Sequence, residues 1–370
     1  MDLDFTGDQD TLRESIRAVL DRESPIALAR GLTEGTETND ALWSVMTELG
    51  WPTLTIPEEN GGIGFGPIEL AILGEELGRN VTGTPLLATL AQFTELVRAC
   101  ADDAQRQRWL EAVANGSVVG TIGIAEETGS FDPRHTTSAG TYNSDRTIVT
   151  LHGTKRFVFE AVAATHIACT VRIEGDLAVV VIDADSARVG AVHAVDATRQ
   201  LATIDLDGLA VPAAHVLRRT SVDAVQYALD DAMVALALET VGACASIFDV
   251  SLEYAKQRKQ FGVPIGSFQA IKHKFADLAV ALERARSTGY FAALCLAEHD
   301  DRMQLAAASA KAAAGDAQRL FGKEGIQIHG SIGFTWEHDL HLYVRRAKSN
   351  EQLFGTASTQ RARIADLLEV

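Results

Sequence analysis

The chain has 370 residues, a hydrophobic content of 46% and a formal net charge of −17. This length predicts roughly two to three domains, and the hydrophobic content excludes a disordered chain. The acidic balance argues against nucleic acid and anionic membrane surfaces as partners, so an anionic cofactor needs a locally basic pocket. No apolar run approaches the ~20 residues of a membrane span. The segment MDLDFTGDQD lacks the basic and apolar regions of a signal peptide, so we expect a cytoplasmic protein.

Three segments that differ in their pattern of residue types follow one another along the chain, and together they predict an α+β fold. We expect an N-terminal helical domain over 1–118, a middle antiparallel β domain over 119–220 and a C-terminal four-helix bundle over 221–370. In the first segment, apolar residues recur at helical spacing. In the second, short β-branched runs are separated by turn residues. Expected strands are Arg146–His152, Lys155–Phe159, His166–Arg172, Leu177–Ile182 and Gln200–Asp205, and expected C-terminal helices are Tyr227–Arg258, Gln269–His299, Arg302–Phe321 and Asn350–Glu369.

Cysteine and histidine spacing predicts no metal site and no disulfide framework. The four cysteines are scattered and are expected to be buried apolar residues in a reducing compartment. His329 and His338 have no cysteine or carboxylate partners at metal-ligand spacing, so core or hydrogen-bonded histidines are expected.

Two motifs near the C-terminus carry the functional signal. The first is RKQFGVPIGSFQ, residues 258–269, and the second is the Gly-punctuated turn in EGIQIHGSIGF, residues 324–334. The planar guanidinium of Arg258 suits a pyrophosphate, although an arginine here can simply cap a helix end. Glycines at a turn let backbone N–H groups approach a phosphate.

Read together, these motifs resemble the C-terminal domain of the acyl-CoA dehydrogenases, and the resemblance extends over essentially the whole chain. It implies that Arg258, Gln260, Phe261 and Gln269 contact the adenine dinucleotide part of FAD across a subunit interface. It adds the turn from Gln327 to Gly330 to this cofactor site, although Ser331 replaces a usual glycine. The alternative for Phe261 and Phe268 is core packing.

The part of the family pattern that holds the flavin ring is degraded in this chain. Family members use a loop like TEPGAGSD, whose hydroxyl and N–H groups hydrogen-bond the flavin edge. Here the stretch reads IAEETGSFD, with Ala125 for the threonine, Glu127 for the proline and only Gly129 left of three small residues. Phe157 and Phe159 take the places of the pair that faces the flavin, and we expect them to alternate into the β core.

Both positions at which the family carries its catalytic glutamate are apolar. They are occupied here by Phe354 and Ala232, and neither side chain can accept a proton. No catalytic residue is therefore assigned to this chain. The nearby carboxylates, expected to be solvated or capping charges, are Asp230, Asp231, Glu239 and Glu351.

An intact adenine side with a degraded flavin side is typical of one subunit of a heterotetrameric dehydrogenase with two copies of each chain. The resemblance then implies an FAD-dependent oxidoreductase of lipid degradation. A second acyl-CoA dehydrogenase-like subunit would supply the flavin-ring site and the base. The substrate would be a bulky, steroid-derived acyl-CoA thioester and the acceptor an electron-transfer flavoprotein. Two alternatives stay open: a self-sufficient homotetramer with an unusual base, and a non-catalytic scaffold on the same fold.

Overall fold

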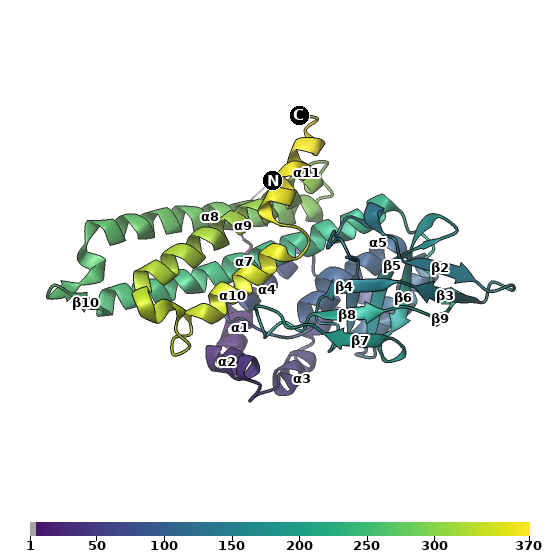
Figure 1. The fold of residues 1–370 in the computed structure, drawn as a ribbon, viewed down its shortest axis with the longest axis horizontal. Coiled ribbons are helices and arrows are strands. Elements are labelled where there is room, and N and C mark those ends of the chain that lie inside the picture. The colour runs from purple at the N-terminus through teal and green to yellow at the C-terminus, as the bar shows by residue number, and fades with distance from the viewer. Residues whose placement is uncertain (1–4) are drawn as a thin grey trace. The chain divides into compact units, whose positions relative to one another are not determined.

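A computed structural model describes residues 5–370 and divides the chain into two compact units (Figure 1). Unit 1 combines the chain up to Asn39 with Pro67–Gly83 and Met233–Val370. Unit 2 combines Asp40–Gly66 with Thr84–Ala232. The helical, β and helical order expected from the sequence is confirmed, with the N-terminal helices shared between the two units.

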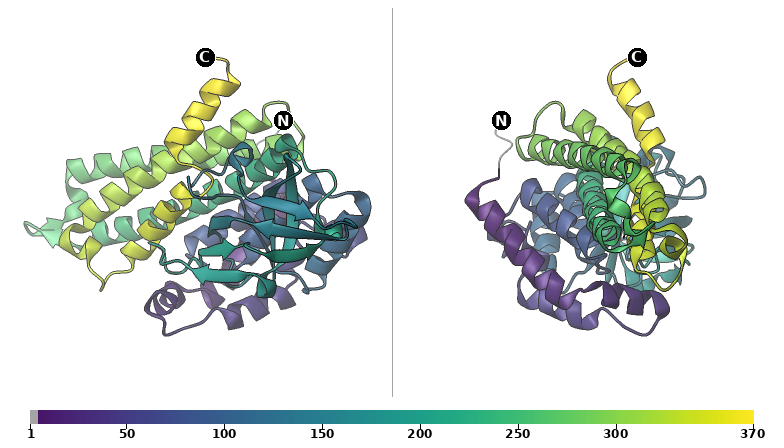
Figure 2. Two further views of the ribbon diagram at one scale, coloured as in Figure 1. Left: turned by 45° about the vertical axis from the view of Figure 1, so that its right-hand side comes forward. Right: turned by 90° about the vertical axis from the view of Figure 1, so that its left-hand side faces the viewer.

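Unit 1 is built on long helices that run alongside one another (Figures 1 and 2). The long helices are α7 (Val222–Gln257), α8 (Gln269–Ala297) and α9 (Met303–His329), followed by α10 (Leu340–Gln352) and α11 (Ala357–Leu367). The N-terminal helices are α1 (Gly7–Glu23), α2 (Ile26–Glu34) and α4 (Pro67–Arg79). The helix predicted over Asn350–Glu369 is confirmed only in its second part, α11, because Phe354 and Gly355 have positive φ values of 56° and 92° and separate it from α10.

Glycines bring α4 and α7 into close contact. A Cβ at Gly74 would lie 2.8 Å from the Ala235 carbonyl oxygen, and one at Gly78 would lie 1.9 Å from that of Glu239. From the other side, a Cβ at Gly242 would lie 1.9 Å from the Glu75 carbonyl oxygen. Only hydrogen fits at these positions, so the two backbones approach closely. Helix α7 is long and apolar enough to cross a membrane, but 83% of its most apolar window is buried, as in a core helix.

Unit 2 contains a six-stranded sheet and a three-stranded sheet. The larger sheet has the order β1-β5-β2-β3-β9, with β6 paired to β5, and the smaller has the order β4-β8-β7. Strand bounds are β1 Gly120–Gly123, β2 Ala139–Tyr142, β3 Ile148–His152, β4 Thr154–Val158, β5 His166–Ile173, β6 Asp176–Asp183, β7 Arg188–Ala191, β8 Ala202–Asp205 and β9 Leu209–Pro212. Their apolar side chains form one core that includes Val149, Ile167, Val180 and Ile204.

The pairing is not wholly antiparallel. Strand β5 pairs in parallel with both β1 and β2, whereas the other strand pairs in unit 2 are antiparallel. Long connections carry the chain from β1 and β2 to β5, and parallel neighbours require such crossovers. Unit 2 also holds α3 (Asp40–Glu48), α5 (Glu95–Cys100), α6 (Asp103–Ala114) and a π-helical turn, η3 (Ala88–Thr94). All four cysteines are free and buried, as expected.

Candidate cofactor-binding site

The first motif forms a short hairpin that projects from the end of unit 1. Strand β10 (Lys259–Gln260) pairs with β11 (Val263–Pro264), so Phe261 and Gly262 make the two-residue turn. Both turn residues have positive φ, 53° and 83°, as a type I′ turn requires. A phenylalanine whose φ lies in this left-handed region raises the backbone energy by on the order of 1 kcal/mol. Phe261 is also 93% exposed. A residue with a strained backbone and an exposed side chain is expected where the chain contacts a ligand or a partner.

The other hairpin residues predicted to hold a cofactor lie beside Phe261 on the same exposed stretch. Arg258 follows the last turn of α7, where its N–H donates to the Tyr254 carbonyl at 2.8 Å. Gln260 is in β10, and Gln269 opens α8, whose N-cap makes no side-chain hydrogen bond. All four predicted residues are exposed. The core-packing alternative for Phe261 and Phe268 is therefore wrong, although the two rings meet edge to face at 6.2 Å.

The second motif lies at the same end of the bundle (Figure 1). Gln327 is exposed on the last turn of α9, and Gly330 follows it with φ +68° in open space, where a Cβ would have no neighbour within 4 Å. Tyr254, on the last turns of α7, joins the two motifs. Its hydroxyl donates to the His329 carbonyl at 3.3 Å, and its ring stacks on that of His329 at 4.4 Å. Sequence reasoning missed Tyr254, although the predicted helix Tyr227–Arg258 places it one turn before Arg258.

His329 and His338 behave as core and hydrogen-bonded histidines, as predicted. His329 is buried, its Nδ1 is 2.8 Å from the Gly325 carbonyl oxygen, and burial lowers its pKa. His338 lies with its ring 4.7 Å from that of His329 and accepts from the Leu340 N–H. Among residues 5–370, no group of three or more potential ligands could hold a metal ion.

The hairpin end of unit 1 is basic within a strongly acidic chain. No aspartate or glutamate occurs from Tyr254 to Ala276. The same stretch carries five lysine and arginine residues, which are Lys256, Arg258, Lys259, Lys272 and Lys274, and of these Lys274 pairs with Glu324 of α9. Exposed donors, an exposed aromatic ring and local positive charge together fit the phosphates and the adenine of a dinucleotide. The residues predicted for the adenine side of FAD are thus brought together in the fold.

The loop expected to border a flavin ring is anchored to neighbouring segments through Glu126. Glu126 accepts from Lys155 Nζ at 2.6 Å and from the N–H groups of Thr137 and Ser138 at 2.9 and 3.0 Å. Although burial opposes it, these bonds lower the pKa of Glu126 to about 2. Ala125 is buried and offers only its backbone, whose carbonyl accepts from Arg156 at 2.8 Å. The loop therefore presents no side-chain hydroxyl at this position.

The two phenylalanines after Lys155 do not alternate into the core as expected. Phe159 is buried, and the guanidinium of Arg199 lies 4.4 Å from its ring centroid. Phe157 is partly exposed with φ +55°, because the pairing of β4 with β8 is irregular between Lys155 and Val158. The prediction is therefore right for Phe159 and wrong for Phe157. Arg199 was not identified from the sequence, since it lies forty residues along the chain with no local signal.

Both apolar base positions are buried. Ala232 lies within α7, and Phe354 follows α10 with its carbonyl accepting from Gln360 at 2.8 Å. Lys311 of α9 fixes the segment that contains Phe354. Its buried Nζ donates at 3.0 Å to the carbonyl oxygens of Asn350, Glu351 and Gly355. Burial lowers the pKa of Lys311 to about 7.

The nearby carboxylates are buried, so the expectation that they are solvated or capping charges is wrong. Glu239 accepts from Arg346 at 2.9 Å and from Asn350 at 3.1 Å. Glu351 accepts from Gln318 at 2.7 Å, from Arg319 at 3.1 Å and from Lys348 at 2.6 Å, and its cationic partners hold its pKa below the usual range against the effect of burial. Most of these partners come from other helices, so the sequence could not show them.

Asp230 and Asp231 are the carboxylates next to Ala232, and both are buried. Asp230 accepts from Gln226 at 3.0 Å. Burial, Glu95 and Asp230 raise the pKa of Asp231 well above its usual value, and Arg98 only partly opposes them. Arg98 pairs with Glu95 at 3.0 Å. A buried carboxyl group with a raised pKa thus lies beside one of the two base positions.

Comparisons with known proteins match both ends of the chain to one family. Residues 6–117 match the acyl-CoA dehydrogenase N-terminal domain, and residues 222–368 match the acyl-CoA dehydrogenase C-terminal domain. A relative from Mycobacterium tuberculosis, "Acyl-CoA dehydrogenase IpdE2", is 32% identical over 349 residues, which cover 92% of this chain and 91% of the relative.

Solved structures share the fold over the full length. The ChsE4–ChsE5 complex of M. tuberculosis has a chain that superposes with a TM-score of 0.90 at 24% identity, covering 100% of this chain and 99% of that chain. Butyryl-CoA dehydrogenase of Megasphaera elsdenii gives a TM-score of 0.90 at 24% identity, covering 100% of both chains.

Proposed function

This chain belongs to the acyl-CoA dehydrogenase family, and from that premise we propose that it is the subunit of a heteromeric enzyme that holds the adenine side of FAD. Members of this family are FAD-dependent oxidoreductases. The proposal rests on one contrast within the chain. The residues for the adenine side are exposed and gathered at one end of unit 1, whereas both base positions are buried and apolar.

Each residue of the two motifs would have a distinct part in holding the cofactor. Arg258 would pair its planar guanidinium with a phosphate, and Phe261 would lie against the adenine ring. The side-chain amides of Gln260, Gln269 and Gln327 would satisfy polar groups of the adenosine, while Gly330 leaves its backbone open to close approach. When bound, FAD supplies the hydride acceptor for α,β-dehydrogenation of an acyl-CoA thioester.

The partner subunit supplies the flavin-ring site and the carboxylate that removes the α-proton. A complex of two different chains is what the name of the ChsE4–ChsE5 complex describes, and this chain shares its fold. By the family resemblance, the substrate is a bulky, steroid-derived acyl-CoA and the electron acceptor is an electron-transfer flavoprotein. The enzyme would work in the cytoplasm.

The test is to purify the chain alone and together with dehydrogenase subunits encoded beside it, and to measure flavin content and native mass. We expect a colourless chain alone and a yellow heterotetramer with about one FAD per pair of chains. Arg258→Ala should lower flavin retention by the complex. The control is Arg146→Ala, which removes an exposed arginine that pairs with Glu174 in unit 2. Equal flavin content in the two variants would count against the proposal.

A self-sufficient enzyme is the alternative, and Asp231 is the observation that favours it. Its buried carboxyl group lies beside Ala232, where the family places one of its bases. A yellow homotetramer that oxidises acyl-CoA by itself, and loses that activity in Asp231→Asn, would establish this alternative. A chain that never binds flavin, even with its partner, would instead indicate a scaffold.

A further inference from the structure

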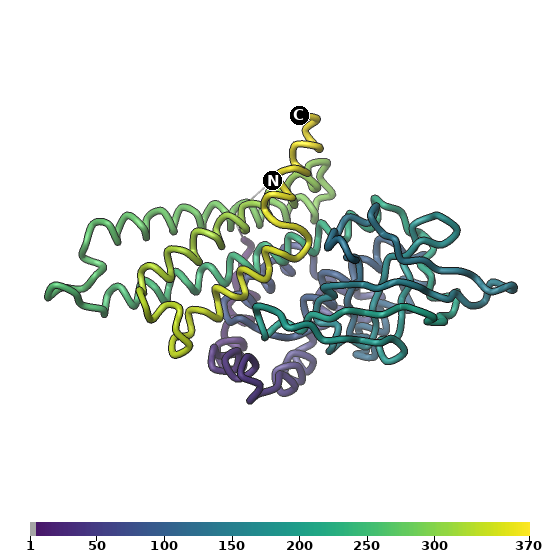
Figure 3. The backbone as a smooth tube through the Cα atoms, in the orientation of Figure 1, coloured from purple at the N-terminus to yellow at the C-terminus, as the bar shows by residue number. Residues whose placement is uncertain are grey.

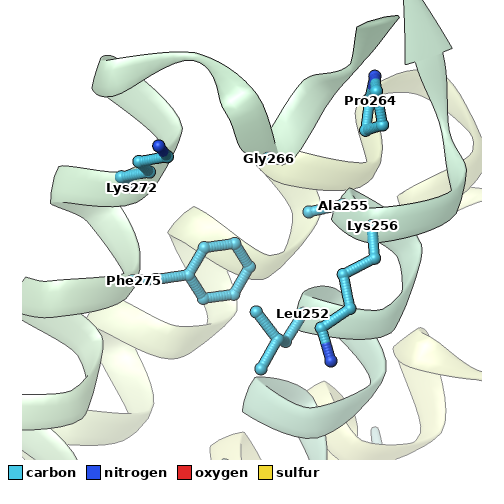
Figure 4. A pocket seen from close by; sticks show the side chains of 7 residues that line it. All are labelled: Leu252, Ala255, Lys256, Pro264, Gly266, Lys272 and Phe275. Atoms are coloured by element: carbon cyan, nitrogen blue, oxygen red, sulfur yellow. The ribbon is translucent and has the colours of Figure 1, made fainter.

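A pocket of about 380 Å³ lies at the base of the hairpin, between the last turns of α7 and the first turns of α8. Leu252 and Phe275 point toward one another across it, with Pro264 and Gly266 of the hairpin closing one side (Figure 4). Lys256 and Lys272 contribute the charged part of the lining. The pocket therefore offers an apolar floor and two ammonium groups at its edge.

The charge around this pocket differs from that of the rest of the chain. Lys256 has one carboxylate near it, Glu253, at 3.8 Å on the exposed face of α7. The whole stretch from Tyr254 to Ala276 contains no acidic residue, in a chain with a net charge of −17. A segment that complements this pocket carries an apolar side chain for the apolar floor, with carboxylates on either side of it for the lysines.

The last turn of α11 and the residues after it have this chemistry. The segment reads Asp366-Leu367-Leu368-Glu369-Val370, so carboxylates alternate with large apolar side chains. Leu368 is 53% exposed and Val370 is 91% exposed. The first turns of α11 are anchored on α9, where a Cβ at Gly315 would lie 2.9 Å from that of Ala357, but every residue from Asp366 onward is exposed.

The segment cannot reach the pocket within one chain. The hairpin lies at one end of the helical bundle of unit 1, whereas α11 projects from the opposite end (Figure 3). In a pair of copies related by a two-fold axis, the segment Asp366–Val370 of each copy can lie in the pocket of the other copy. The geometry points to such a swap, and we propose that the pocket lined by Leu252, Lys256, Lys272 and Phe275 binds the segment Asp366–Val370 of a second copy of this chain.

In this contact, Leu368 fills the apolar floor, and Asp366 and Glu369 face the two lysines. The inference goes beyond the proposed function and does not depend on it, because it needs two copies of this chain and no flavin. Both a heterotetramer with two such copies and a homotetramer satisfy that condition.

The first experiment is a disulfide trap on the full chain, alone and co-expressed with a partner subunit. The double variant Lys256→Cys/Leu368→Cys is oxidised and run on non-reducing gels. The native cysteines are buried and do not compete. We expect a covalent dimer as the main band. The control Lys323→Cys/Leu368→Cys, with a highly exposed lysine of α9 that does not line the pocket, should give at least several-fold less dimer. Equal dimer yield in the two variants, or monomer only, would overturn the proposal.

Charge reversal gives a second, independent readout. Lys256→Glu/Lys272→Glu should shift the sedimentation of the chain toward the monomer, and adding Asp366→Lys/Glu369→Lys should restore the original mass. Leu368→Asp should also dissociate the pair, whereas Leu49→Asp, at a leucine of similar 49% exposure in unit 2, should not. If the lysine substitutions dissociate the pair and Asp366→Lys/Glu369→Lys does not restore the original mass, the pocket binds a different occupant, such as an anionic small molecule, and the exchange is refuted. Flavin content is measured in parallel, so a failed exchange with normal flavin leaves the proposed function standing.

Discussion

Replacing Arg346 with methionine should destabilise unit 1 strongly, because it leaves Glu239 buried without its cation. The Arg346 guanidinium is fully buried and donates to Glu239 Oε1 at 2.9 Å. It also donates to the carbonyl oxygens of Thr82 and Val81, at 2.9 and 3.3 Å. These bonds connect α10 to α7 and to the residues that follow α4.

The size of the effect follows from burial. Removing one partner of a buried ion pair costs about 3–5 kcal/mol, since the remaining charge has lost both water and its counter-ion. A typical domain has only about 5–15 kcal/mol of stability, so the loss is a large fraction of the total. Replacing both partners with apolar residues is often far cheaper. We therefore expect Arg346→Met/Glu239→Leu to recover at least about 2 kcal/mol relative to Arg346→Met.

Urea unfolding followed by far-UV circular dichroism measures these differences, because unit 1 is mainly helical. Tryptophan fluorescence is a poorer probe, since three of the four tryptophans, Trp43, Trp51 and Trp109, lie in unit 2. The control is Arg345→Met, which removes the neighbouring arginine that stacks over Trp336 on the surface. A loss below about 1 kcal/mol in Arg346→Met, or purely additive effects of the two substitutions, would refute the ion-pair argument.

Four further predictions concern the site and its supports. Lys311→Met should lower stability by at least about 2 kcal/mol in urea, because three buried carbonyl oxygens lose their donor; a neutral effect would show that water replaces the amine. Folding lowers the pKa of Glu126 to about 2, so the contribution of this carboxylate to the free energy of unfolding is complete above about pH 4.5 and is lost as the pH falls toward 2. The free energy of unfolding should therefore depend less steeply on acid pH in Glu126→Gln, and identical curves would contradict this. Phe261→Gly should raise stability by about 1 kcal/mol by removing the strained φ, yet lower flavin retention by the complex; unchanged flavin content would argue against contact with the cofactor. Asp231 has a raised pKa, so the stability of the native protein should fall as the pH rises above about 4, and Asp231→Asn should remove that slope; equal slopes would mean that the carboxyl group is ionised.

Local patterns predicted many of the helices and strands and the two motifs of the candidate cofactor site. The runs around Leu177–Ile182 and His166–Arg172 predicted β6 and β5 to within a residue at each end. The fixed spacing from Arg258 to Gln269 predicted a set of residues that the fold does gather on one exposed stretch. Where the prediction failed, a contact from another element decided the outcome. Phe354 breaks the predicted last helix while Lys311 of α9 holds the carbonyls around it.

The sequence by itself determined the family, the order of helical and β segments, and the loss of both base positions, because each of these depends on residue identity and spacing along the chain. Only the tertiary structure decided the state of the carboxylates and the meeting of the two motifs that are proposed to bind the cofactor. Glu239 is an ion-pair partner because Arg346, more than a hundred residues later, folds against it. The hairpin and the turn after Gln327 share one end of the bundle, where Tyr254 contacts His329. Burial and pKa depend on neighbours in space, and these neighbours come from distant parts of the chain.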